Sequence, residues 1–371
     1  MTQKPKPRYI MIGGFLGAGK STTILKLAKY LQNKSIKVGL ITNDQSVGLV
    51  DTNVATAAGY DVEEITGGCF CCRFDSLVDA ADRLSKSNTP DVFIAEPVGS
   101  CTDLVATVSY PLRRMYGDAY TIAPMSVLVD PIRCMRVLGL DDGKTFSQKV
   151  MYIYRKQLEE AKYIVINKCD LLSKEQLDAL ASALQAEFPA SEVFVVSARD
   201  GQGLEPWFDR IVDEEITIGP AMEVDYQLYG EGEALLGWLN ATVTVSSEKA
   251  FDGEVVMLDI AQHIQKELAA QGFEIAHLKM TLMRQGGAED VAVLNLVRND
   301  YVPEMSQSLF DKLLAGELVI NVRAEGDPEL IKAATVDAIN VVAAKLGVTV
   351  TTEHIEHFRP GQPTPTHRVE I

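Results

Sequence analysis

The glycine-rich segment between residues 14 and 21 limits the possible folds of this chain more than any other part of it. It matches the pattern G-x-x-x-x-G-K-S and reads Gly14-Phe-Leu-Gly17-Ala-Gly19-Lys20-Ser21. A short apolar run typical of a strand ends at about Ile12, and helical spacing of apolar residues begins after Lys20. Glycines in such a loop let backbone N–H groups and the N-terminus of the helix face phosphate oxygens. The segment therefore predicts a nucleotide-binding loop between a buried strand and a helix.

The first 217 residues alternate strand-like and helix-like patterns. Short apolar runs rich in β-branched residues, among them KVGLIT, DVFIAE, SVLVD, YIVINK and EVFVV, are separated by stretches with helical spacing. Continuous apolar strands that alternate with helices are typical of a parallel sheet covered on both faces. We therefore expect residues 1–217 to form an α/β nucleotide-binding domain of the P-loop type with a mainly parallel sheet.

A second, smaller α+β domain is predicted over residues 218–371. The stretch 214–232 is rich in Glu and Gly and has weak periodicity, and the pattern changes after it. The expected order is strand, helix, two strands, helix at 305–315, strand, helix and strand, which a ferredoxin-like domain would fit. Asp327, Pro328 and Gly347 have the residue types that cap a helix between them. The proline-rich tail 358–367 is expected to be loosely ordered.

The charge balance excludes some partners and suggests another. Lys and Arg number 35 against 51 Asp and Glu, a net charge of −16, which disfavours non-specific binding to nucleic acid or to an anionic membrane. Residues 218–371 hold 11 basic and 23 acidic side chains, so most of the negative charge lies there. These charges can be plain solvated surface, or they can form a docking surface for a partner protein with a basic patch. The oligomeric state stays open.

Neither a membrane span nor a secretory signal is expected. No apolar run reaches the roughly 18 residues that a spanning helix needs. The basic N-terminus runs into the glycine loop without a small-residue cleavage site. A cytoplasmic protein is the resulting expectation.

A second motif narrows the nucleotide to one base. Asn167-Lys168-Cys-Asp170 closes the apolar run YIVI, and Ser197-Ala198 follows the next apolar run. A carboxylate such as that of Asp170 can accept from the N1–H and 2-amino groups of guanine, whereas adenine offers no such pair of donors. The pattern therefore predicts GTP and GDP rather than ATP as ligands. Ordinary turn chemistry is the competing interpretation for Asn167 and Asp170.

Other candidate residues for phosphate and Mg²⁺ chemistry stand at strand ends. In a P-loop, Lys20 would neutralise the β- and γ-phosphates and the Ser21 hydroxyl would bind Mg²⁺. Glu96 closes the run VFIAE and could hold Mg²⁺ directly or through water, while the Gly99 N–H could contact the γ-phosphate. Asp44 ends the second strand. Ligands bind beyond the carboxyl ends of parallel strands, so Asp44 and Glu96 should face one crevice.

Three of the six cysteines gather at Cys69, Cys71 and Cys72, directly after Gly67-Gly68. Thiolates are soft ligands suited to Zn²⁺, Cu(I) and related metals, and three of them leave a coordination position open. A redox-active cluster and plain packing are the alternatives. The remaining cysteines, Cys101, Cys134 and Cys169, are isolated in the sequence and are expected to be buried small apolar residues.

With these motifs in hand, the first ~200 residues resemble the CobW-type GTPases, a P-loop class that also contains HypB and UreG. The matching segments are GGFLGAGKST at 13–22, ND at 43–44, ITGGCFCCRFDSL at 65–77, EPVG at 96–99, VLVDPIR at 127–133, QLEEA at 157–161 and NKCDLL at 167–172. The resemblance implies a GTP-hydrolysing metallochaperone or metal-insertion protein, of the kind associated with cobalamin synthesis and nitrile hydratase activation. The His-rich loop of several members is missing, and the C-terminal ~150 residues match poorly.

The resemblance also implies roles for individual residues. Gly14 through Thr22, Ala18 included, would bind phosphates and Mg²⁺, and Lys20, Asp44 and Glu96 would serve catalysis. Cys69, Cys71 and Cys72 would bind Zn²⁺, Co²⁺ or another divalent transition metal for delivery to a client metalloenzyme or cofactor-synthesis protein. Asn167, Lys168 and Asp170 would read guanine, and Ser197 and Ala198 complete the expected nucleotide-binding set. Two alternative functions remain, a GTP-gated chaperone that loads or reactivates a corrinoid-type enzyme and a metal-sensing regulatory GTPase.

Overall fold

Two compact units make up the chain in this computed structural model, which describes residues 6–43 and 50–370. Unit 1 comprises residues 1–45, 60–229 and 362–371, and unit 2 comprises residues 46–59 and 230–361. The predicted boundary after residue 217 lies earlier in the chain than this division. Residues 218–229 stay with unit 1 because hydrogen bonds hold them there: the Gly219 N–H donates to the Tyr110 hydroxyl over 3.0 Å, and the Tyr229 hydroxyl accepts from Thr102 N over 3.1 Å.

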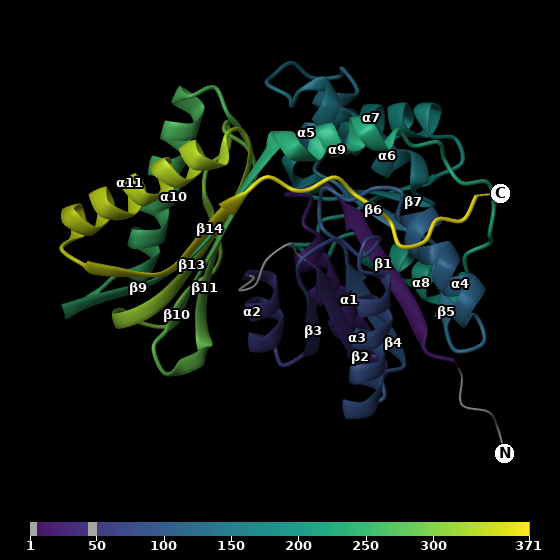
Figure 1. Cartoon of the computed structure of the whole chain (residues 1–371), viewed down its shortest axis with the longest axis horizontal. Helices are drawn as coiled ribbons and strands as arrows, with labels where there is room; N and C mark the ends of the chain where they lie inside the picture. The colour runs from purple at the N-terminus through teal and green to yellow at the C-terminus, as the bar shows by residue number, and fades with distance from the viewer. Residues whose placement is uncertain (1–5, 44–49, 371) are drawn as a thin grey trace. The chain divides into compact units, whose positions relative to one another are not determined.

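The described part of unit 1 forms an eight-stranded parallel sheet (Figure 1). Its strands are β1 (Arg8–Gly14), β2 (Val38–Asn43), β3 (Asp61–Ile65), β4 (Val92–Glu96), β5 (Thr121–Ile122), β6 (Ser126–Val129), β7 (Tyr163–Ile166) and β8 (Glu192–Val195). Their order along the sheet is β3-β2-β4-β1-β6-β7-β8, with β5 paired to β1. Because every pair is parallel, the carboxyl ends of these strands meet at one edge, where ligands of such sheets bind.

Helices between the strands cover the sheet of unit 1. They are α1 (Lys20–Asn33), α3 (Phe74–Ser87), α4 (Tyr110–Tyr116), α5 (Pro131–Val137), α6 (Gln148–Glu160), α7 (Lys174–Glu187) and α8 (Leu204–Asp213). All residues of β4, β6 and β7 are buried, as expected for strands covered on both faces. The predicted α/β domain with a parallel sheet is therefore confirmed.

Unit 2 is an antiparallel sheet covered by helices. Its main elements are β9 (Leu236–Phe251), α10 (Gly253–Ala270), β10 (Glu274–Arg284), β11 (Gly287–Leu296), β12 (Glu304–Gln307), β13 (Leu313–Glu325), α11 (Pro328–Leu346) and β14 (Thr349–Phe358). The strand order is β12-β11-β10-β13-β9-β14. Without β11 and β12, the sequence β-α-β-β-α-β with this order is that of a ferredoxin-like domain, as predicted.

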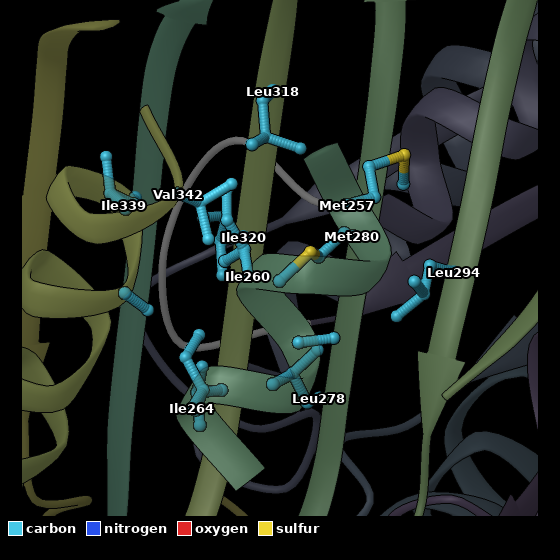
Figure 2. Close-up of a cluster of buried hydrophobic side chains, with 14 of the residues drawn as sticks. Met257, Ile260, Ile264, Leu278, Met280, Leu294, Leu318, Ile320, Ile339 and Val342 are labelled. Atoms are coloured by element: carbon cyan, nitrogen blue, oxygen red, sulfur yellow. The ribbon is translucent and has the colours of Figure 1, made fainter. Parts of the chain in front are cut away.

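Apolar side chains from the sheet and from both long helices form the core of unit 2. Figure 2 shows Met257, Ile260 and Ile264 of α10 gathered with Leu278 and Met280 of β10. Buried side chains of β11, β13 and α11 complete the labelled cluster: Leu294, Leu318, Ile320, Ile339 and Val342. The helix α2 (Val50–Ala57) packs against β10, β11 and β13 of the same unit. Unit 2 thus has a hydrophobic core of its own.

The helix predicted at residues 305–315 is wrong. Residues 304–307 form β12 and pair antiparallel with β11, and Leu313 already begins β13. The prediction relied on apolar residues with helical spacing. These residues do not share one buried face in the structure, because Leu313 is fully buried whereas Phe310 is 81% exposed. In contrast, the predicted helix between Asp327 and Gly347 is confirmed as α11, with Asp327 accepting from Glu329 N over 2.9 Å.

The search for membrane spans gives no candidate in the part of the chain that the structure describes. None of the helices found there combines enough length with enough apolar character to cross a bilayer.

Candidate nucleotide and metal site

The glycine loop between β1 and α1 has a shape that only glycine permits at two positions. Gly14 and Gly19 have φ angles of 130° and 92°. A Cβ on Gly14 would lie 2.3 Å from the Leu128 carbonyl oxygen, and one on Gly19 would lie 2.4 Å from Asn167 Nδ2. The buried Lys20 donates from Nζ to the Gly14 carbonyl over 2.9 Å, so its ammonium group lies over the loop. This is a cradle of backbone amides with a fixed positive charge, which fits a polyphosphate.

Beside the loop, the structure brings Ser21 and Glu96 together. The Ser21 hydroxyl donates to Glu96 Oε1 over 3.1 Å, and the Glu96 side chain is almost fully buried at the end of β4. A hydroxyl and a carboxylate are oxygen ligands of the kind that Mg²⁺ takes. Gly99 presses on the same loop, since a Cβ there would lie 2.8 Å from Leu16 Cδ2. Thr22, the last residue of the predicted phosphate segment, is exposed at the start of α1.

The Asn-Lys-x-Asp segment after β7 is tied to the glycine loop by its first two side chains. Asn167 Nδ2 donates to the Ala18 carbonyl over 2.9 Å, and Asn167 Oδ1 accepts from Ala198 N over 2.9 Å. Ser197, next to Ala198, donates to Asp200 Oδ2 over 3.2 Å. Asp170 is exposed, so its carboxylate is accessible to a ligand. Asn167 therefore joins the loop after β8 to the glycine loop.

Lys168 is placed by an acidic residue at the end of β6. Its Nζ donates to the Gly17 carbonyl over 2.7 Å and to Asp130 Oδ2 over 2.9 Å. Asp130 also caps α5, because its Oδ1 accepts from Arg133 N over 3.0 Å. Asp130 thus caps α5 and positions Lys168 at the same time. The lysine stem lies along the loop, where it can form one wall of a base-binding slot.

The three cysteines before α3 form a compact thiol cluster. The Cys69 Sγ lies 2.8 Å from the Cys71 Sγ and 3.1 Å from the Cys72 Sγ, and the last two are 3.7 Å apart. All three sulfur atoms thus lie within 4.8 Å of one another. Cys69 and Cys71 are buried, whereas Cys72 is half-buried. Three thiols held this close can share one soft metal ion.

Ionisation of the cluster is uneven. Hydrogen bonds from Cys101, Cys71 and Cys72 lower the pKa of the Cys69 thiol well below its ordinary value. The same contact with Cys69 raises the pKa of Cys71, and it raises that of Cys72 to about 11. Of the three clustered thiols, Cys69 therefore loses its proton most readily. A bound metal ion would favour loss of the second and third protons, because its positive charge offsets the repulsion between neighbouring thiolates.

A fourth thiol belongs to this neighbourhood, which the sequence did not reveal. Cys101 was expected to be an isolated apolar residue, and it is indeed buried, but its thiol hydrogen-bonds with that of Cys69. It follows Glu96 by five positions, in the loop after β4. Cys134 and Cys169 are buried, as expected. Single cysteines carry no local signal of partnership, so only the tertiary structure could show that Cys101 differs from the other two.

The end of β2 holds the backbone that leads into the thiol cluster. Asn43 Nδ2 donates to the Ile65 carbonyl over 3.0 Å and to the Gly68 carbonyl over 2.7 Å. Gly68 directly precedes Cys69 and has a φ of 150°. Asp44, a predicted catalytic residue, lies outside the described residues. Asn43 itself was not singled out by the sequence beyond its place in the Asn-Asp pair.

Comparison with known proteins agrees with these motifs. A family model for the CobW/HypB/UreG nucleotide-binding domain matches residues 8–195. The zinc chaperone CobW of Sinorhizobium sp is 27% identical over 213 residues, which is 52% of this chain and 59% of that protein. The zinc chaperone YeiR of Escherichia coli (strain K12) is 28% identical over 176 residues, 47% of this chain and 50% of that protein. The chain thus spans little more than half the length of these curated relatives.

Solved structures show a likeness as well. HypB from Helicobacter pylori in complex with nickel aligns with a TM-score of 0.43 and 20% identity, covering 58% of this chain and 92% of that chain. The family match extends over half of the sequence and includes the glycine loop, the cysteine cluster, Glu96 and the Asn-Lys-x-Asp segment. The chain belongs to the CobW/HypB/UreG family.

Proposed function

We propose that this chain is a GTP-hydrolysing metallochaperone that couples its nucleotide state to metal binding at Cys69, Cys71 and Cys72. The observation that carries the proposal is the loop after β4. Glu96, at its start, accepts a hydrogen bond from Ser21 of the nucleotide loop, and Cys101, five residues on, hydrogen-bonds with Cys69. One short segment therefore contacts both the phosphate cradle and the thiol cluster.

In the nucleotide half of the site, Lys20 and the amides of the glycine loop hold the β- and γ-phosphates. Ser21 and Glu96 would hold Mg²⁺, which would supply positive charge to offset the negative charge that develops during hydrolysis. We assign the Gly99 N–H to the γ-phosphate, and we assign the same task to Asp44, which lies outside the described residues. Positioning and electrostatics make up most of the catalysis. We expect turnover to be slow without a client.

Guanine recognition rests on the carboxylate of Asp170. It accepts from N1–H and the 2-amino group, and the Lys168 stem covers one face of the base. Asn167 orients the slot through Ala18 and Ala198, both of which it contacts. Because adenine lacks this pair of donors, GTP and GDP are the ligands of choice.

The thiol cluster binds the cargo metal, for which Zn²⁺ and Co²⁺ are the candidates. The relatives described as zinc chaperones support zinc. Cys101 adds a fourth thiol next to Cys69, and the three clustered thiols leave a coordination position open to the client. Since Cys101 shares its loop with Glu96, a change at the γ-phosphate alters the geometry around the metal.

Delivery requires a client, and the acidic segment 218–371 is the part we assign to docking it. Its 11 basic and 23 acidic side chains favour a client with a basic surface. The client is a metalloenzyme or a protein of cofactor synthesis, the two classes that a metal carrier of this family would serve.

The metal assignment is tested by substituting Cys71→Ser together with Cys72→Ser. The double variant removes two of three clustered thiols, so we expect Zn²⁺ affinity, measured by competition with a chromogenic chelator, to fall by at least about a hundredfold. Binding of GTP, measured by calorimetry, should stay within about twofold of the parent. Lys20→Ala is the matched control, because it should lose nucleotide and keep metal. An unchanged Zn²⁺ titration in the double variant would refute the metal site.

A further inference from the structure

The proline-rich C-terminal tail, expected to be loosely ordered, instead lies against the thiol cluster within unit 1; it is the yellow segment that ends at C in Figure 1. The Thr364 N–H donates to the Cys72 Sγ over 3.3 Å. Thr366 adds two bonds, from its N–H to the Cys71 carbonyl over 2.8 Å and from its hydroxyl to the Cys72 carbonyl over 3.2 Å. The tail therefore contacts the cluster at its most exposed thiol and at the backbone that carries it.

An ion pair anchors the tail a few residues farther on. Arg368 Nε lies 2.7 Å from Asp103 Oδ2, and Asp103 is only 1% exposed. Arg368 Nη2 also donates to the Met222 carbonyl over 2.7 Å. Asp103 has a φ of 63°, a conformation that costs free energy and persists where surroundings enforce it. A buried carboxylate that keeps such a partner is strongly destabilised when the partner is removed.

Apolar and aromatic contacts complete the attachment. The Val369 side chain is buried, and its N–H donates to the Ala106 carbonyl over 2.9 Å. The His367 ring meets the Phe74 ring edge-on with 5.0 Å between centroids, and Phe74 opens the helix that follows the cluster. The tail is thus fixed to the Cys loop, to α3 and to the segment after Asp103, by contacts of several kinds.

We propose that residues 362–370 are a positioning element of the metal site: they fix Cys72 through the Thr364 N–H and cover the cluster, and the Arg368–Asp103 ion pair holds them there. The inference rests on the proposed metal-binding function and deepens it. An N–H donor to a metal-bound sulfur orients that ligand, and loss of such outer contacts costs about 10- to 100-fold in metal affinity. The tail also limits the path by which a metal leaves.

The anchor connects the tail to the nucleotide half of the site. Asp103 lies in the loop after β4, two residues after Cys101 and seven after Glu96. A shift of this loop on loss of the γ-phosphate would move Asp103 and strain its pair with Arg368. Release of the tail then becomes the step that opens the cluster for transfer.

Zn²⁺ release from the loaded full-length protein tests the inference. Arg368→Gln should release Zn²⁺ to an excess of chelator about tenfold faster than the parent, and its 69–73 backbone amides should exchange hydrogen faster in the metal-free state. Arg83→Gln is the matched control, since Arg83 of α3 pairs with Glu63 of β3 away from the tail, and it should match the parent in both measurements. Parental release rates for Arg368→Gln would overturn the inference, even if amide exchange changed.

A truncation after Gly361 guards against a trivial loss of folding. It should also release Zn²⁺ about tenfold faster, and a synthetic peptide of residues 362–371 added in trans should restore the parental rate. No restoration with a truncated protein that still melts cooperatively would overturn the inference. Failure of the underlying function looks different: Zn²⁺ binding that survives Cys71→Ser with Cys72→Ser refutes the metal site without involving the tail.

Discussion

At the scale of single residues, Cys101 has the most informative position. Its backbone is held by α6, because Gln157 Nε2 donates to the Cys101 carbonyl over 2.8 Å and to the Gly99 carbonyl over 3.0 Å. Its thiol hydrogen-bonds with that of Cys69, and this contact lowers the pKa of Cys69. Because α6 fixes its backbone, Cys101 can transmit small movements of the loop after β4 to the thiol cluster.

Cys101→Ala should weaken Zn²⁺ binding by about tenfold, because it removes the thiol that stabilises the Cys69 thiolate. Cys134→Ala is the matched control, since Cys134 is also buried, lies on α5 and has its own pKa raised to about 12 by burial. Both variants lose one buried sulfur, at a similar cost of about 1 kcal/mol in stability. Chelator competition measures the metal affinity. Equal Zn²⁺ affinities of the two variants would show that Cys101 only packs.

Local motifs allowed the sequence to predict residues such as Lys20, Asp170 and Cys71, because the required chemistry is written in short, fixed spacings. The structure brings Ser21 and Glu96 together, 75 positions apart, at the edge where parallel strands end. Other partnerships have no such spacing. Asp103 with Arg368 spans 265 positions, and nothing in either neighbourhood marks it.

At the scale of elements, the junction between α6 and the loop after β4 buries a carboxyl group. Glu160 ends α6, where its carboxylate accepts from Val105 N over 2.9 Å and from the Thr102 hydroxyl over 3.2 Å. Burial, together with the nearby Asp103, raises the pKa of Glu160 to about 8 from an ordinary 4.5. A π-helical turn, Val105–Ser109, follows at once, a distortion that is frequent at functional sites.

The raised pKa gives stability a pH dependence of known sign. Below about pH 4.5 Glu160 is protonated in both states; between about 4.5 and 8 the unfolded chain ionises it and the folded protein does not, so stability falls as pH rises. We expect Glu160→Gln to lose this component, which makes its free energy of unfolding fall less between pH 5 and pH 8, by about 1–3 kcal/mol. Urea unfolding at both pH values measures it. Glu159 is an exposed neighbour, so Glu159→Gln should behave like the parent. The same pH dependence in Glu160→Gln and in the parent would contradict the raised pKa of Glu160.

Elements differed in how far the sequence could predict them. Strands of unit 1 and the capped helix α11 were recognisable because burial on both faces and cap residues leave local patterns. The segment 304–315 was not, because its apolar residues fit a helix as well as they fit β12 and β13. The tail 362–370 forms neither helix nor strand, so its order depends wholly on distant partners.

At the scale of the whole molecule, three other described segments of unit 1 are linked to the thiol cluster. Asn43 at the end of β2 holds Gly68, the β4 loop carries Glu96 and Cys101, and the tail joins Asp103 to Cys72 through Arg368 and Thr364. Of the three, the loop after β4 also contacts the glycine loop, because Glu96 accepts from Ser21 over 3.1 Å. We infer that γ-phosphate loss and metal release are steps of one conformational change.

This coupling is tested most directly by measuring Zn²⁺ affinity in the presence of Mg²⁺ with GDP and with a non-hydrolysable GTP analogue. We expect affinities that differ by at least about fivefold, and thermodynamic linkage then requires Zn²⁺ to change the ratio of the affinities for the GTP analogue and for GDP by the same factor. Cys71→Ser with Cys72→Ser should abolish the difference in nucleotide affinity. Equal Zn²⁺ affinities in the two nucleotide states would rule out coupling between the γ-phosphate and the metal site.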